Sequence, residues 1–93
     1  MRGNRQSKDM KAYQVFSGED DKHGNQQWDL QATYLNKDKA LAHCDTIVAN
    51  EKLYDGDTIE FGGWSKDGKY ATWYIRGWEY VGCCRFEEID ITE

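Results

Sequence analysis

Histidine or cysteine residues lie side by side at two places in the sequence, and both residue types can bind zinc or act as nucleophiles. His43 precedes Cys44, and Cys83 precedes Cys84. Successive side chains diverge by about 100° around a helix and point to opposite faces of a strand. At most one residue of each pair can therefore turn toward a shared metal ion. We predict no zinc site and no catalytic Cys–His pair, and we interpret Cys44 as a buried core residue.

Carboxylates gather in the polar segment 18–27, where Glu19-Asp20-Asp21 comes shortly before His23. Oxygen ligands of this kind suit Mg²⁺, so a small metal-dependent hydrolase or nuclease that uses residues 19–23 is one alternative function. A hydrolytic site also needs a lysine or further carboxylates on rigid strands, and a charged loop is usually only solvated. The sequence leaves both interpretations of this segment open.

Short motifs of the common enzyme classes are absent from the sequence. There is no glycine-rich phosphate loop, no Cys-x-x-Cys, no His-Glu-x-x-His and no Gly-x-Ser-x-Gly. We therefore predict a protein without enzymatic activity, catalytic residues or a cofactor.

Aromatic residues are concentrated between Trp64 and Tyr80, with one arginine among them. In a strand over 70–78, alternate side chains share a face. One face then carries Tyr70, Thr72, Tyr74, Arg76 and Trp78, and the other carries Ala71, Trp73, Ile75 and Gly77. The second set is smaller and more apolar, which suits packing under a helix, so we expect the first set to face outward.

Exposed Tyr, Trp and Arg side chains are typical of the residues that dominate protein interfaces. We predict a partner-binding surface with acidic residues at its rim and a partner with a basic surface. The predicted site residues are Tyr70, Tyr74, Arg76, Trp78, Glu79, Glu87 and Glu88. Two alternatives are that these aromatic residues close a small curved sheet, or that they are buried at the two-fold interface of a homodimer.

A helix over 37–50 is the element that must cover the sheet. Asn36 can accept a hydrogen bond from the first turn as the N-cap residue. The apolar residues fall at the spacing of one helix face, and they are Ala40, Leu41, Cys44, Ile47 and Val48. We expect this face to pack on the sheet.

Period-two patterns and turn residues predict an antiparallel sheet around that helix. Gly62-Gly63 indicates a bulge or a close backbone approach, and Glu87-Glu88 indicates a bulge. Asp67-Gly68 indicates a hairpin turn. The predicted strands are 12–17, 28–35, 58–64, 70–78 and 80–91. The fold class is α+β, a single helix packed on an antiparallel sheet in the order ββαβββ. We expect one domain over 11–93 after a disordered tail over 1–10.

Length and charge limit the function classes. The 93 residues suffice for one domain, and no apolar run reaches the roughly 20 residues that a membrane helix needs. A net charge of −5 disfavours attraction to nucleic acid or to an anionic membrane. No apolar stretch follows the basic N-terminal residues, and the cysteine count is odd, which favours a reduced cytoplasmic protein.

The segment Tyr13–Glu19 (YQVFSGE) and the junction Tyr34–Ala40 (YLNKDKA), with an acidic last strand at 87–91 (EEIDI), carry a resemblance. The chain resembles a family of small phage and bacterial proteins that open with two strands and a helix. The resemblance implies the ββα opening and a phage or mobile-element origin, and it implies no catalytic residue. We predict a non-enzymatic protein-binding module, a phage-encoded accessory protein or inhibitor that acts on a host protein in the host cytoplasm. Two alternative functions stay open: the metal-dependent hydrolase or nuclease described above, and a homodimeric structural protein.

Overall fold

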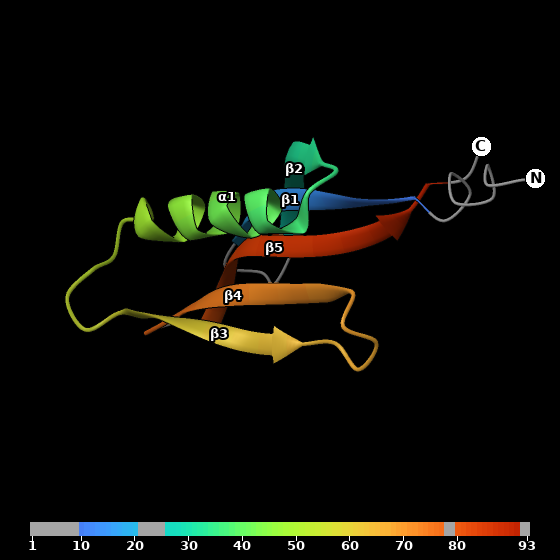
Figure 1. Ribbon diagram of the computed structural model, residues 1–93. Coiled ribbons are helices and arrows are strands. Elements are labelled where there is room, and N and C mark those ends of the chain that lie inside the picture. Colours follow the sequence, from blue (N-terminus) through green and yellow to red (C-terminus); the bar gives the residue numbers. More distant parts are fainter. Residues whose placement is uncertain (1–9, 21–25, 78–79, 92–93) are drawn as a thin grey trace, which may run out of the picture.

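One helix packs on one antiparallel sheet in the computed structural model, which describes residues 10–20, 26–77 and 80–91 (Figure 1). The sheet has five strands in the spatial order β2-β1-β5-β4-β3. In chain order the elements are β1 (Lys11–Asp20), β2 (Gln26–Tyr34), α1 (Lys37–Ala49), β3 (Thr58–Trp64), β4 (Tyr70–Arg76) and β5 (Tyr80–Asp90). This arrangement confirms the predicted α+β class and the order ββαβββ. Residues 1–9 of the tail predicted over 1–10, and the predicted site residues Trp78 and Glu79, lie outside the described residues.

The helix follows the sequence pattern closely. Asn36 caps it, because the Asn36 Oδ1 atom accepts a hydrogen bond from the Lys39 N–H at 3.1 Å. Ala40 and Cys44 are fully buried. The partly buried helix residues packed against the core are Leu41, Ile47 and Val48. The predicted extent, cap and sheet-facing side of the helix are therefore confirmed, with the helix ending at Ala49.

α1 covers only part of its face of the sheet. It packs on β1, β5 and β2, and Figure 1 shows β4 and β3 lying beyond it. The buried core is correspondingly centred under the helix, and its members are Val15, Ala40, Cys44, Cys83, Cys84 and Phe86. We expected Ala71, Trp73 and Ile75 to lie under the helix. Ala71 is buried, but Trp73 and Ile75 are only partly buried at the margin of this core.

The first hairpin is longer than the sequence predicts. The sequence predicts a loop over 18–27, but β1 continues to Asp20 and pairs there with Gln26 at the start of β2. A strand ladder is held by backbone hydrogen bonds, which polar side chains do not prevent. The side chains of the proposed metal ligands at 19–23 lie outside the described residues.

Bulges set which side chains reach which face. The register shifts between Phe61 and Trp64, which confirms the irregularity predicted at Gly62-Gly63. The bulge predicted at Glu87-Glu88 is wrong, because the β1–β5 ladder runs there without a shift. Alternation then places Glu87 and Glu88 on opposite faces of the sheet.

A bulge that the sequence did not predict lies in β5. Trp73 pairs with Cys84 but Tyr74 pairs with Gly82, so Cys83 is the extra residue. Both Cys83 and Cys84 consequently belong to the core under α1, although adjacent strand residues were expected to diverge.

Trp28 of β2 lies flat across two glycines on the face of the sheet away from α1. A methyl group on Gly18 of β1 would collide with its ring, and one on Gly82 of β5 would lie 2.6 Å from Trp28 Cη2. The indole therefore crosses β1 and reaches β5. The absent side chains at these glycines make room for it.

Gly82→Ala is expected to lower the free energy of unfolding by about 1–3 kcal/mol, the usual cost of overpacking. The cause is displacement of the Trp28 ring, so the same substitution in a Trp28→Ala background should cost almost nothing. Urea denaturation of the four variants of this cycle measures both values. An equal cost in the two backgrounds would contradict the contact between Trp28 and Gly82.

Candidate functional site

The β3–β4 hairpin is the part of the sheet that α1 leaves uncovered, and its helix side is aromatic. Phe61 and Trp73 have ring centroids 5.1 Å apart, and Phe61 and Trp64 have centroids 6.2 Å apart. Trp64 also meets the core residue Phe86 edge-on at 5.3 Å. We call Phe61, Trp64 and Trp73 the aromatic cluster. It is a continuous set of rings that runs from the buried core to the edge strand.

Solvent reaches the outer members of the aromatic cluster. Phe61 is 46% exposed and Trp64 is 43% exposed. The ammonium group of Lys37, at the start of α1, lies 5.1 Å from the centre of the Trp64 ring as a cation–π contact. The sequence does not single out Phe61 as a surface residue, because the pattern of an apolar residue in a strand is typical of the core. The sequence does contain one signal for this exposure: a single short helix cannot cover a sheet of five strands.

The opposite, open face of the hairpin carries the residues that the sequence predicted as a partner site. Tyr70 pairs with Glu87, Tyr74 with Glu60, and Arg76 with Thr58, so these side chains share one face. Tyr70 is 46% exposed, and the guanidinium carbon of Arg85 lies 5.0 Å from its ring. Tyr70 thus leans toward β5.

Tyr74 leans the other way, toward the edge strand. Its ring lies over Gly62, where an added methyl group would come within 2.6 Å of Tyr74 Cε2. A cleft of about 210 Å³ results between the two tyrosines, and its lining consists of Gly62, Gly63, Trp64, Ser65, Tyr70, Thr72 and Tyr74. Thr72 lies between the tyrosines on the same strand face and is buried.

Ion pairs balance the charges around this face. Arg76 contacts Glu60 at 3.2 Å, and Arg85 contacts Glu87 at 3.0 Å. Glu88 lies on the helix side of the sheet and contacts Lys11 at 3.5 Å. The structure therefore brings Tyr70, Tyr74, Arg76 and Glu87 together, and it places Glu88 on the other face.

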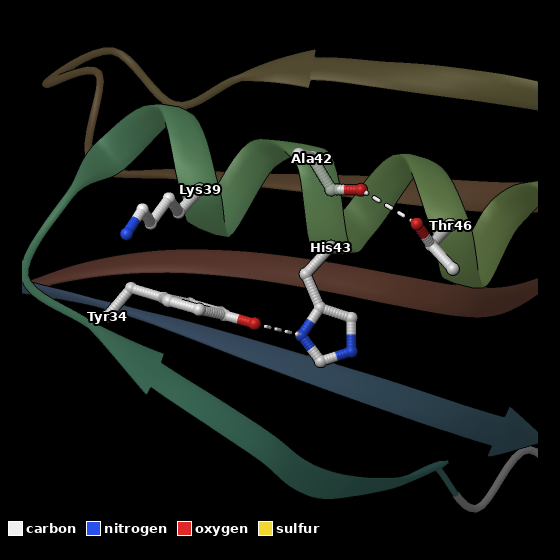
Figure 2. Close-up of a pocket in the computed structure, with 5 residues that line it drawn as sticks. All are labelled: Tyr34, Lys39, Ala42, His43 and Thr46. Atoms are coloured by element: carbon white, nitrogen blue, oxygen red, sulfur yellow. Dashed lines mark hydrogen bonds between the residues drawn. The ribbon is translucent and has the colours of Figure 1, made fainter.

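A second hollow lies between α1 and the edge strand β2. The Tyr34 hydroxyl and His43 Nδ1 are hydrogen-bonded at 3.1 Å, and Figure 2 shows the two side chains pointing toward each other below the helix. The hollow has a volume of about 410 Å³ and is lined by Tyr34, Lys39, Ala42, His43 and Thr46. Its lining includes no carboxylate that could orient the imidazole, so the geometry of a nucleophile, base and acid is not assembled among these residues.

The three cysteines are free thiols within one core. Burial raises the pKa of the Cys83 thiol to about 11, and the hydrogen bond with Cys44 and burial raise the pKa of Cys84. A thiol must lose its proton to act as a nucleophile or a metal ligand. In the described part of the chain, no group of three or more His, Cys, Asp or Glu residues is arranged to hold a metal ion.

Fold and site together define an α+β domain whose β3–β4 hairpin, at one edge of the sheet, carries exposed aromatic residues on both faces. Comparison with protein-family models, curated proteins and solved structures gives no significant match. None of the described helices has the length and apolar character needed to cross a membrane.

Proposed function

We propose that this chain is a non-enzymatic protein-binding module that recognises its partner through the open face of the β3–β4 hairpin. The observation that carries the proposal is the cleft between Tyr70 and Tyr74. In the biological setting that the sequence suggests, the module is a phage-encoded accessory protein or inhibitor, and the partner is a host protein in the cytoplasm.

Physical chemistry supports a protein partner for this face. Tyrosine buries a large area at little cost in side-chain entropy, and tyrosine and arginine are among the residues that dominate interface energetics. A cleft between two tyrosines can accept one anchoring side chain of the partner, whereas a flat surface offers no such anchor. Arg76 and Arg85 each lie next to a carboxylate on this face, so a partner would meet both charges already paired.

The negative net charge of the chain favours a partner with a basic surface. It acts by long-range attraction during encounter more than by ion pairs in the contact itself. The chain has a net charge of −5, which speeds encounter with a basic surface. The contact face itself is balanced by the pairs Arg76–Glu60 and Arg85–Glu87. Raising the salt concentration should therefore slow association and leave dissociation nearly unchanged.

Tyr70→Ala tests the proposal once a partner has been captured from the host cell and purified. We expect the variant to weaken binding by about 30-fold or more, the cost of losing a central aromatic anchor, without a large change in melting temperature. Biolayer interferometry measures the affinity, and circular dichroism measures the melting temperature.

Tyr54→Ala is the matched control, because Tyr54 is an exposed tyrosine in the loop between α1 and β3. It should bind like the wild type. If Tyr70→Ala and Tyr74→Ala are both folded and both bind like the wild type, the partner does not use this face.

A further inference from the structure

β3 is an edge strand with a free backbone edge. It pairs with β4 on one side, and no other strand of the described chain pairs with its outer side. Natural edge strands are usually protected by lysine, proline or a bulge. β3 (TIEFGGW) has no lysine and no proline, and its register shift is confined to the half between Phe61 and Trp64, so the half Thr58–Phe61 is a regular edge.

Apolar surface lies directly beside that edge. Phe61 and Trp64 of the aromatic cluster belong to β3 and are almost half exposed. The only charged residue of the strand, Glu60, lies on the other face and is paired with Arg76. A strand added next to β3 would cover the aromatic cluster without burying an unpaired charge.

The two ends of β3 carry opposite charge. Before Thr58, residues 51–57 contain three carboxylates and one lysine, which are Glu51, Lys52, Asp55 and Asp57. Beyond Trp64, the turn contains Lys66, Asp67 and Lys69, of which Lys69 contacts Asp90 at 3.9 Å, and Lys37 of α1 lies over the Trp64 ring. An antiparallel copy of the same strand would bring each acidic end beside a basic end.

We propose that β3 pairs antiparallel with β3 of a second copy of this chain, around a two-fold axis at Phe61. The pairing joins two five-stranded sheets into one continuous sheet and satisfies the free edge. The two Phe61 rings meet on the helix side as a cross-strand pair. In this register the regular half of β3 in one copy pairs with the half of the second copy that contains Gly62 and Gly63. Glu60 lies opposite Gly62 of the second copy, so the two Glu60 carboxylates do not face each other.

This inference does not rest on the partner surface proposed above, although Gly62, Gly63 and Trp64 of β3 also line the cleft between Tyr70 and Tyr74. A two-fold axis perpendicular to the sheet keeps corresponding faces on the same side, so both copies present the cleft between Tyr70 and Tyr74 toward one side. The dimer uses the edge and helix side of the hairpin, and the partner protein uses its open face. A failure of one proposal therefore leaves the other unchanged.

Sedimentation velocity across the micromolar concentration range tests the pairing. We expect the wild type to show a concentration-dependent monomer–dimer equilibrium. Phe61→Lys places like charges at the centre of the interface and should raise the dimer dissociation constant by at least about tenfold, as for a central interface residue. Leu30→Lys, on the opposite edge strand β2, is the matched control and should dimerise like the wild type.

Two results would overturn the proposal. One is a wild type that stays monomeric at every concentration, and the other is a dimer whose dissociation constant Phe61→Lys leaves unchanged. A melting temperature of Phe61→Lys close to that of the wild type shows that loss of the dimer is not loss of the fold.

Cross-linking tests the register without relying on a disruptive charge. In the proposed pairing, the residues at position 61 of the two copies face each other, so Phe61→Cys should form a dimer that is reversible by thiol under mild oxidation. Leu30→Cys should stay monomeric on the same non-reducing gel. Equal cross-linking of the two variants would overturn the register.

Discussion

Phe86→Ala is expected to lower the free energy of unfolding by about 3–5 kcal/mol, the usual cost of truncating a buried aromatic residue. Phe86 is fully buried and pairs with Val15 in β1 and Ala71 in β4, so it lies at the middle of the sheet. Its ring stacks on Tyr13 at 5.8 Å and meets Trp64 at 5.3 Å. Removing it leaves a cavity between the helix-covered half and the hairpin. Such a loss is a large fraction of the stability of a small domain.

Urea denaturation followed by tryptophan fluorescence measures the effect. Leu30→Ala is the control, because Leu30 is an apolar residue that is exposed on the edge strand β2, and it should cost much less. If the two substitutions cost the same, Phe86 is not the centre of the core. A Phe86→Ala protein that is unfolded without denaturant agrees with the prediction.

The helix and the fold class were predictable because local signals agreed with one another. Asn36 marks the start of the helix, and the spacing from Ala40 to Val48 marks the face that meets the sheet. The turn at Asp67-Gly68 likewise identifies a hairpin, and Gly68 has the positive φ of 72° that such a turn favours. Each of these features is set by residues that are close in the sequence.

The order of the strands in the sheet, and which of them the helix covers, were not predictable from the same signals. Which strands the helix covers depends on long-range pairing, and β1 between β2 and β5 places α1 away from β3. Phe61 therefore has the sequence pattern of a core residue but lies at an exposed edge. Cys83 has the pattern of an outward residue but is buried, because a bulge adds one residue to β5. A shift of one residue reverses the face of a side chain.

The candidate site was predictable in part for the same reason. Alternation along β4 predicts that Tyr70, Tyr74 and Arg76 share a face, and they do. The sequence does not show that Tyr70 and Tyr74 lean apart over Arg85 and Gly62, which is what forms the cleft. If the chain dimerises through β3, two such clefts face one side, and a partner with two matching sites would gain apparent affinity without any new contact.

Raising the pH above the ordinary pKa of a thiol is expected to destabilise the protein through Cys83. Cys83 is only 2% exposed, and burial raises its pKa from 9.0 to about 11. Below pH 9.0 the thiol is protonated in both the folded and the unfolded chain, so its contribution to stability is complete. Between that pH and about 11, the unfolded chain loses the proton and the folded chain keeps it. The free energy of unfolding should fall across this window by about 2–3 kcal/mol, at about 1.36 kcal/mol per unit of pKa difference.

Urea denaturation in reducing buffer at neutral and alkaline pH measures this loss, and Cys83→Ala separates it from the titration of other groups. The variant should be less stable than the wild type at neutral pH, because a buried side chain has been truncated. Its further loss at alkaline pH should be smaller, because the position no longer releases a proton when the chain unfolds. Cys84 has a pKa raised in the same direction, so part of the alkaline loss should remain in the variant. Equal alkaline losses in the wild type and in Cys83→Ala would show that the Cys83 thiol is accessible to water in the folded protein. The bulge in β5 would then not direct this side chain into the core.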